Sequence, residues 1–320
     1  MHKSSDRASR VRRGVPAVAI AVGALVTVGT VAAPADAASR SRFYVSGCGM
    51  PSSPVDVWKR VSNYKTVIAL DGLRATNDES GWRHETNIHK LAGKGVNVVE
   101  PVGGLASFYT DWARKPGNKQ KYKYSWTCRL NSLIRELDAR GYSAGRWNKY
   151  AIMGISMGGN SALTYAAKHR KRISHAFSMS GYLNLSAPAM RESIKVALFD
   201  AGREAGRGPY NADDMWGPPW DKRWVDNDPF HLTGKMRGMK VRIAAATGAP
   251  GKYDVHAENS TKGAPLETAS IAQTKAFQTQ ADRDRLKLST DYQLQGTHAW
   301  GYWQEAVWRA HRAGWFRDRY

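Results

Sequence analysis

The sequence predicts an α/β fold, with a mostly parallel central sheet that helices cover on both faces. Short apolar runs of strand length recur through the chain. Segments with helical character separate these runs, and glycine or proline turn signals follow several elements. Strands that alternate with helices are typical of parallel sheets, because each parallel connection has to cross back over one face of the sheet.

The predicted elements follow one another in this alternating order. Strands are expected at residues 66–70, 96–99, 149–154, 173–180, 241–247 and 288–294. Helices are expected at residues 87–92, 125–140 and 160–169, and from about residue 302 onward. The helix at 125–140 has leucine and isoleucine at helical spacing, and Gly141 supplies the stop signal.

Residues 182–235 break the alternation. This stretch contains five prolines and a cluster of three tryptophans, Trp216, Trp220 and Trp224. We expect it to be an insertion folded over the carboxyl edge of the sheet, where open α/β sheets bind their ligands. Most tryptophans simply fill cores, so core packing is the alternative for each of them.

The N-terminus has the features of an export signal. A basic start precedes an apolar run at residues 15–33, and Ala35-Asp36-Ala37 forms a small-x-small cleavage site. The alternative is an uncleaved anchor, but the glycine and alanine content of the run favours cleavage. We therefore expect a signal peptide at residues 1–37, a single catalytic domain at residues 38–320, and a secreted protein of the cell envelope or extracellular space. No later segment is apolar for long enough to cross a membrane.

The chain is strongly basic, with a formal charge of +21, or +18 over residues 38–320. Such a charge favours an anionic neighbourhood, such as acidic envelope polymers or phospholipid headgroups. Nucleic acid is not an expected partner, because no zinc-finger spacing or RNA-binding signature is present. Two cysteines, Cys48 and Cys128, in an exported protein predict one disulfide, with two buried thiols as the alternative.

The most informative motif is Gly154-Ile155-Ser156-Met157-Gly158, between a predicted strand and a predicted helix. This context is typical of a nucleophile elbow, a tight strand-to-helix turn that lifts a serine hydroxyl above the sheet. The pattern alone is weak, because a chain rich in glycine and serine contains it by chance fairly often. Its position at the end of a predicted strand makes Ser156 the candidate nucleophile of an α/β-hydrolase.

Such a nucleophile needs a histidine base and an acid, which follow it in the chain. His298 lies just after the last predicted strand and before the last predicted helix, where the base belongs. Asp254, Glu258 and Glu267 follow the strand at 241–247, and the sequence pattern leaves all three open as the acid. The acid would fix the imidazole tautomer and stabilise the imidazolium.

The oxyanion hole requires two backbone N–H donors. One belongs to Met157, directly after the serine, and the other to a loop that follows an earlier strand. The loop 71–74 follows the strand at 66–70, so the Leu73 amide is the expected second donor. The sequence contains no zinc-protease spacing and no phosphate loop, so we expect neither a metal nor a cofactor.

Several stretches resemble one family, the antigen 85 mycolyltransferases and their corynebacterial relatives. The matching segments run in the family's order from about residue 66 to 304. They are Leu70-Asp71-Gly72-Leu73-Arg74-Ala75, Gly81-Trp82, Pro101-Val102-Gly103-Gly104, Ser107-Phe108-Tyr109-Thr110-Asp111-Trp112, the elbow, Ala212-Asp213-Asp214-Met215-Trp216-Gly217-Pro218, Asn227-Asp228-Pro229 and Gly296-Thr297-His298 with Trp300 and Tyr302-Trp303.

The resemblance implies an α/β-hydrolase fold and a role for each of several residues. Its acid is the glutamate of a Leu-Glu pair ten residues before a phenylalanine, a spacing that Leu266-Glu267 and Phe277 reproduce. Its oxyanion donors correspond to Leu73 and Met157. Its sugar-contacting residues correspond to Asp71, Arg74 and Trp300, with a surface ion pair as the alternative for Arg74.

The resemblance also implies an activity. We expect transfer of a mycoloyl group from trehalose monomycolate to a second trehalose monomycolate or to arabinogalactan, with trehalose mycolates and envelope glycolipids as partners. One alternative is a secreted carboxylesterase that uses the same triad with water as acceptor. Another is an adhesin with a vestigial triad, against which the intact Ser156, Glu267 and His298 argue.

Overall fold

The computed structural model describes residues 38–63, 65–142, 149–255 and 257–317. The predicted signal peptide lies outside the described residues. Within them, an eight-stranded sheet has the order β1-β2-β4-β3-β5-β6-β7-β8. The strands are β1 (Ser39–Val45), β2 (Ser53–Lys59), β3 (Lys65–Leu70), β4 (Val96–Pro101), β5 (Tyr150–Ile155), β6 (Ile173–Met179), β7 (Lys240–Ala246) and β8 (Leu288–Gln293).

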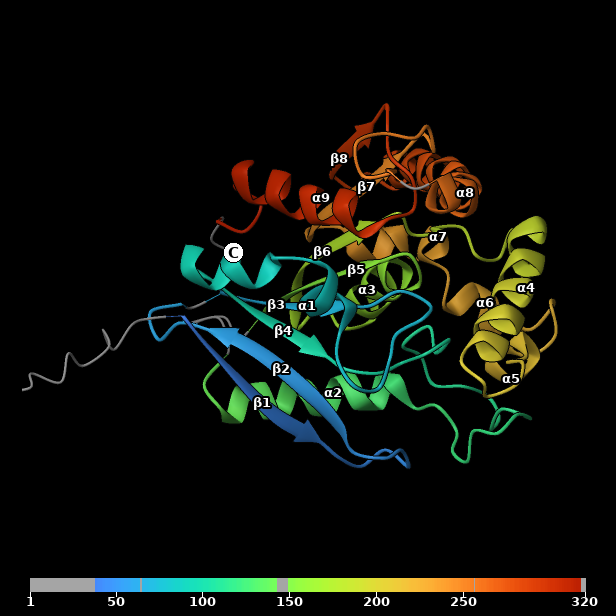
Figure 1. The fold of residues 1–320 in the computed structure, drawn as a ribbon, viewed down its shortest axis with the longest axis horizontal. Coiled ribbons are helices and arrows are strands. Elements are labelled where there is room, and N and C mark those ends of the chain that lie inside the picture. Colours follow the sequence, from blue (N-terminus) through green and yellow to red (C-terminus); the bar gives the residue numbers. More distant parts are fainter. Residues whose placement is uncertain (1–37, 64, 143–148, 256, 318–320) are drawn as a thin grey trace, which may run out of the picture. The chain divides into compact units, whose positions relative to one another are not determined.

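The sheet is parallel from β4 to β8, and only β1 and β2 run antiparallel to their neighbours (Figure 1). The predicted α/β class with a mostly parallel sheet is therefore confirmed. Each predicted strand corresponds to one of β3 to β8, within one or two residues at either end. Every residue of β4 and β6 is buried, as expected for parallel strands covered on both faces.

Helices cover both faces of the sheet and follow most of the strands. They are α1 (Gly81–Glu85), η1 (Ile88–Lys94), α2 (Trp126–Ala139), α3 (Met157–Lys168), α4 (Pro188–Glu204), α5 (Ala212–Trp216), α6 (Lys222–Asp226), α7 (Pro229–Leu232), η3 (Thr233–Met236), α8 (Ala257–Arg283) and α9 (Trp300–Arg312). Residues of α2, α3 and α8 pack in the core on one face of the sheet. Residues of α1, η1 and α9 pack in the core on the other face. None of the helices within the described residues is both long and apolar enough to span a membrane.

The antiparallel hairpin of β1 and β2 was not predicted, and charged side chains hold it in place. Asp56 is buried in β2 and forms ion pairs with Arg40 at 2.8 Å and with Arg42 at 2.7 Å. Arg129 of α2 is buried beneath the loop after β1, where it donates to the Gly47 carbonyl at 3.0 Å and to other carbonyls of that loop. Paired charges let a strand with exposed polar positions join the sheet.

A disulfide fastens the same hairpin to α2. Cys48 and Cys128 are bonded, with their Cα atoms 5.9 Å apart, which confirms the predicted bridge. The bond closes a separation of 80 residues. A crosslink over so long a segment removes much conformational freedom from the unfolded chain and thereby stabilises the folded one.

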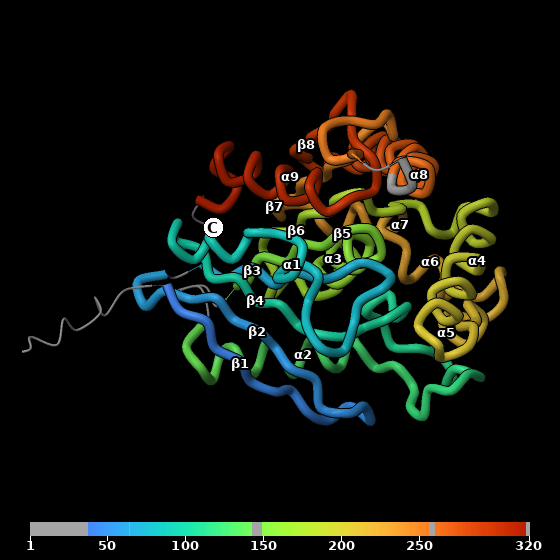
Figure 2. Tube along the Cα trace, viewed as in Figure 1, coloured from blue at the N-terminus to red at the C-terminus, as the bar shows by residue number. Residues whose placement is uncertain are grey.

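The insertion at residues 182–235 forms α4 to α7 and η3, and its Cα trace is the yellow-green to orange segment in Figure 2. In Figure 1, α4, α5 and α6 lie beyond the arrowhead of β4, on the carboxyl side of the parallel strands. Trp216 and Trp224 are fully buried and contact each other edge to face at 5.0 Å. Trp220 is 84% exposed. Two of the three clustered tryptophans therefore fill the core of the insertion.

Candidate active site

Ser156 lies in the sharp turn between β5 and α3, at the carboxyl end of a central strand. Its backbone has φ 49° and ψ −122°, a conformation that non-glycine residues rarely adopt. The Ser156 N–H donates to the Met179 carbonyl at 2.8 Å, which ties the turn to the end of β6. The side chain is only half-buried. A strained and accessible serine at this place is the geometry of a nucleophile elbow.

The two glycines of the motif make this turn sterically feasible. A Cβ atom on Gly158 would lie 2.3 Å from the Asp71 carbonyl oxygen, and one on Gly154 would lie 2.3 Å from the Gly158 carbonyl oxygen. Both distances are far below a van der Waals contact. Glycine at these positions therefore lets α3 start directly against the ends of β3 and β5.

Two backbone amides near Ser156, those of Met157 and Leu73, donate no hydrogen bond within the described residues. Met157 is the first residue of α3, so its N–H has no carbonyl one turn earlier to bond to. The Leu73 carbonyl accepts from Ala106 N at 2.8 Å, which fixes this peptide in its loop. Unpaired amides of this kind are available to a developing oxyanion.

His298 and Glu267 form a buried hydrogen-bonded pair. His298 Nδ1 lies 2.9 Å from Glu267 Oε2, and the side chains are 8% and 2% exposed. Glu267 Oε1 accepts from the Ser180 hydroxyl and from the Ala246 N–H, both at 2.8 Å. These contacts leave the Glu267 carboxylate oriented toward the imidazole. Its bond to Nδ1 leaves Nε2 as the basic nitrogen.

Ser180 is a supporting residue that the sequence analysis missed. It directly follows β6, and its φ of 51° places it, like Ser156, in the left-handed region. Its hydroxyl accepts from Trp303 Nε1 at 2.9 Å, so its own hydrogen is directed to Glu267. The Trp303 ring meets His298 edge to face at 4.9 Å. Ser180 and Trp303 thus hold both members of the acid–base pair, and only their positions at strand and helix ends could have indicated them.

The structure distinguishes the acids that the residue pattern left open. Asp254 accepts from the Tyr302 hydroxyl at 2.5 Å, from Gly251 N at 2.8 Å and from the Thr297 hydroxyl. Burial would raise the pKa of Asp254, but the hydrogen bonds from Thr297 and Tyr302 outweigh it and lower that pKa. The Glu258 side chain lies outside the described residues. Of the acids whose side chains are described, Glu267 is the one bonded to His298.

Ser156 and the acid–base pair meet at the end of β6. The Met179 carbonyl accepts from the Ser156 N–H, and the next residue, Ser180, donates to Glu267. No hydrogen bond joins the Ser156 hydroxyl to His298 in the described part of the chain. Catalytic hydrogen bonds are often long in free enzymes and tighten when substrate binds. The backbone therefore brings the three residues to one edge of the sheet, but the Ser156 hydroxyl and the His298 imidazole are not hydrogen-bonded to each other within the described residues.

Asp71 and Trp300 converge on Gly81, next to the oxyanion loop. Asp71 is 1% exposed and accepts from the Ser80 hydroxyl at 3.0 Å and from Gly81 N at 3.2 Å. Burial raises the pKa of Asp71 to about 7. A Cβ on Gly81 would lie 2.4 Å from the Trp300 ring and 3.4 Å from Asp71 Oδ1. The Asp71 carboxyl and the Trp300 ring therefore lie next to the same glycine.

Arg74 points elsewhere. Its guanidinium binds Asp200 of α4 at 2.6 Å and also Glu204, and all three side chains are about half exposed or more. These ion pairs connect the oxyanion loop to the insertion. The alternative reading of Arg74 as a surface ion pair therefore describes its contacts in this structure.

A cavity of about 600 Å³ adjoins Glu267 on the α9 side of the sheet. Its apolar wall includes Met179, Ala244 and Trp303. Its charged groups are largely paired with one another, because Arg309 binds Asp291 at 3.0 Å and Lys252 binds Glu305. Among the described residues, neither Ser156 nor His298 lines it. The cavity therefore adjoins the Glu267 side of the acid–base pair, and neither Ser156 nor His298 forms part of its wall.

A mostly parallel sheet with a strained serine at the central elbow and a buried histidine–glutamate pair defines the α/β-hydrolase class. A family model described as "Putative esterase" matches residues 52–313, and the chain belongs to this family and to its antigen 85 acyltransferase branch.

Similarity to known proteins supports this assignment. The chain is 34% identical over 247 residues to "Diacylglycerol acyltransferase/mycolyltransferase Ag85B" of Mycolicibacterium smegmatis, covering 74% of this chain and 72% of the relative. It is 32% identical over 301 residues to the Ag85A protein of Mycobacterium tuberculosis, covering 88% and 86%. The crystal structure of Mycobacterium tuberculosis MPT51 superposes with a TM-score of 0.71 at 25% identity, covering 88% of this chain and all of that one.

Proposed function

We propose that this protein is a secreted mycolyltransferase that moves a long-chain acyl group from trehalose monomycolate to a second trehalose monomycolate or to arabinogalactan. The observation that carries the proposal is the buried pair of His298 and Glu267 at 2.9 Å, beside a strained Ser156 that follows β5. Membership in the antigen 85 family supports the acyl chemistry and the choice of substrates.

In the first step, the Ser156 hydroxyl attacks the ester carbonyl of the donor. His298 Nε2 takes the serine proton as the bond between Oγ and the acyl carbon forms, and Glu267 stabilises the resulting imidazolium. The Leu73 and Met157 amides stabilise the negative charge on the carbonyl oxygen, a contribution of about a hundredfold or more in rate for each donor. The bond from the acyl carbon to the trehalose oxygen then breaks, and His298 returns the proton to that oxygen.

In the second step, a hydroxyl of the acceptor attacks the acyl-enzyme. His298 takes the proton from this hydroxyl, the new ester bond forms, and Ser156 leaves with a proton returned by the imidazolium. Whether a sugar or water serves as acceptor depends on binding next to the serine. Asp71 and Trp300, which converge on Gly81, are the groups we assign to the sugar. Hydrolysis by water with the same residues would make the protein a carboxylesterase.

The test uses a trehalose monoester with a defined acyl chain. Mass spectrometry of the products should show trehalose diester and free trehalose in equal amounts, with little free acid. Free acid as the main product, even at high monoester concentration, would contradict the transferase assignment and support an esterase. Arabinogalactan added to the same reaction should acquire acyl groups at the expense of diester.

The nucleophile is tested separately with a fluorophosphonate probe. The wild-type protein should be labelled at Ser156, and Ser156→Ala should lose both labelling and turnover. Ser193→Ala is the matched control, because Ser193 lies on α4 and its hydroxyl donates to the Ala189 carbonyl of its own helix. An unlabelled wild-type protein that is folded and binds trehalose esters would support a binding role without catalysis.

A further inference from the structure

The positive charge of the chain is concentrated at one edge of the sheet. The segments that lead into the parallel strands, together with the end of the chain after α9, lie at the amino ends of these strands. They are residues 59–65, 90–95, 168–172, 235–240, 283–287 and 312–317. Together they contain 17 Lys or Arg residues and a single acidic residue, Asp284. Asp284 is engaged by the Thr233 hydroxyl and by Gln280.

The opposite edge has a more balanced composition. The segments that follow the carboxyl ends of the strands are residues 71–80, 102–125, 180–187, 247–255 and 294–299. They contain seven Lys or Arg residues and five Asp or Glu residues. This edge holds Ser156, Glu267 and His298. The excess of positive charge therefore lies at the amino ends of the strands, away from the catalytic residues.

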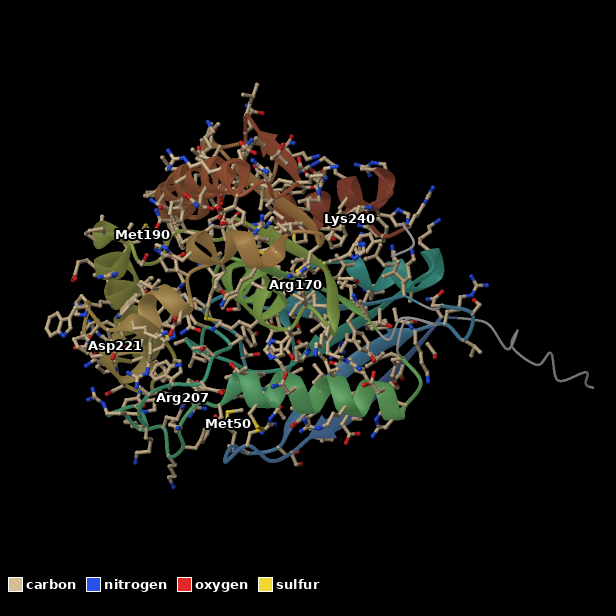
Figure 3. All side chains as sticks on the ribbon, turned by 180° about the vertical axis from the view of Figure 1, so that it is seen from behind. Met50, Arg170, Met190, Arg207, Asp221 and Lys240 are labelled. Carbon is tan, nitrogen blue, oxygen red and sulfur yellow. A yellow bond between two sulfur atoms is a disulfide. The ribbon has the colours of Figure 1, made fainter. Side chains whose placement is uncertain are left out.

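Contacts show that the basic segments lie together. Arg170, before β6, donates to the Arg237 carbonyl, before β7, at 2.9 Å. Lys240 and Lys65 donate to the carbonyls of Trp315 and Phe316 in the segment after α9. In Figure 3, the labelled Arg170 and Lys240 lie away from Met190 and Asp221, which belong to the insertion. The parallel pairing of β4 with β3 and of β8 with β7 places residues 90–95 and 283–287 beside these segments. We call the surface formed by the six segments the basic edge.

Many cations of the basic edge are exposed and carry a net charge that the protein does not neutralise. Arg172 is paired with Asp138 of α2. Lys171, Lys287 and Arg312 are exposed and form no ion pair within the described residues. Like charges held close together repel one another, and an anionic partner would remove that repulsion.

We propose that the basic edge is a docking surface for a linear polyanion, a polymer with regularly spaced phosphate or carboxylate groups. Neighbouring strands are about 4.8 Å apart, so the row from β4 to β8 presents cations over roughly 24 Å. A chain of anionic groups laid across the strand ends meets one basic segment after another. Docking in this way leaves the carboxyl edge, with Ser156 and His298, facing away from the polymer.

The distribution of apolar side chains favours a polymer over a lipid surface. A membrane-binding face combines cations with exposed apolar anchors. Among the large exposed apolar side chains of the described residues, Val61 is the one that lies in a basic segment. Val196, Phe199, Trp220 and Val225 all lie in the insertion. The basic edge therefore carries charge with almost no apolar surface.

The test measures binding to inorganic polyphosphate as a function of salt. The edge variant combines Lys171→Gln, Lys287→Gln and Arg312→Gln. The control variant combines Lys115→Gln, Lys121→Gln and Lys123→Gln, which are equally exposed and change the net charge by the same amount. The edge variant should bind at least tenfold more weakly at 0.1 M salt, and the slope of log K against log salt concentration should fall by about two to three. The control variant should keep most of the affinity.

Equal losses in the two variants, or unchanged binding of the edge variant, would overturn the docking surface. Strong binding to vesicles of phosphatidylglycerol without binding to polyphosphate would overturn the polymer in favour of a membrane. Both variants should keep the melting temperature and the ester turnover of the wild type, which excludes misfolding as the cause of a loss. Ser156→Ala should bind polyphosphate normally, so the docking surface and the proposed catalysis can fail independently.

Discussion

Replacing Glu267 by glutamine changes one hydrogen-bond partner and leaves the shape of the site intact. Glu267 Oε1 accepts from Ala246 N and from Ser180, whose own oxygen is already occupied by the Trp303 N–H. The Ala246 N–H can only donate. The glutamine oxygen therefore has to stay beside it, and the glutamine NH₂ has to face His298 Nδ1. An NH₂ donor requires an unprotonated Nδ1, which moves the imidazole proton to Nε2.

A histidine protonated at Nε2 cannot take the proton of Ser156. We therefore expect kcat for a p-nitrophenyl ester to fall by about 10⁴-fold, as a wrong tautomer does in other serine-nucleophile enzymes. This corresponds to about 5 kcal/mol of transition-state stabilisation. The melting temperature should change little, because each buried polar atom keeps a partner. Stopped-flow measurement of p-nitrophenol release gives the acylation rate directly.

Asp254→Asn is the matched control, because Asp254 is the rival acid and is bonded to Thr297 and Tyr302. It should cost less than tenfold in the same assay. A folded Glu267→Gln protein within tenfold of the wild type would refute the tautomer reasoning. So would an Asp254→Asn protein that is slowed as much as Glu267→Gln.

Three further changes test other parts of the structure. Asp71 has a pKa raised to about 7 by burial, against 3.8 in the unfolded chain, so its ionisation costs folding free energy as pH rises between these values. In urea unfolding, the free energy of unfolding of Asp71→Asn relative to that of the wild type should therefore increase by on the order of 4 kcal/mol from pH 4 to pH 8. A difference that does not change with pH would contradict the buried carboxyl. Gly158→Ala should lower stability by about 1–3 kcal/mol and reduce ester turnover, because its Cβ would lie 2.3 Å from the Asp71 carbonyl, while Gly93→Ala, with no atom near its Cβ, should do neither. Removing the bridge with Cys48→Ser and Cys128→Ser should cost about 2–5 kcal/mol for the 80-residue separation, seen as a lower melting temperature that reductant no longer changes.

The parallel strands could be predicted because strands that are buried on both faces consist largely of consecutive apolar residues. The strand at 66–70, for example, corresponds to β3, in which every residue from Thr66 to Leu70 is buried. The hairpin of β1 and β2 carries no such run. Its first strand alternates serine and arginine, and what holds it is Asp56, which lies 14 residues from Arg42 and pairs with it only in the folded state. Local pattern cannot reveal a partner that folding supplies.

The acid shows the same limit within the site. Asp254, Glu258 and Glu267 all follow β7, and the sequence pattern left the three open as the acid. Glu267 lies in α8, a 27-residue helix that was not predicted because Gly263 and Pro265 interrupt its helical signals. The glycine has a tertiary reason, since a Cβ there would lie 3.2 Å from His298 N. Family resemblance placed the acid at Glu267, whereas residue patterns alone left the choice open.

The ion pairs of Arg74 have a consequence for how a sugar would enter. Arg74 directly follows Leu73, whose N–H is the expected oxyanion donor. The side chain that forms ion pairs with α4 therefore belongs to the residue next to this donor. A ligand hydroxyl or acidic group that bonds to Nε and Nη2 of Arg74 has to displace Asp200 and Glu204. Exposed ion pairs of this kind contribute only about 0.2–1 kcal/mol each, so breaking them costs little free energy. The ligand and the carboxylates of α4 would then compete for the Arg74 guanidinium, so that binding of the sugar there would release α4.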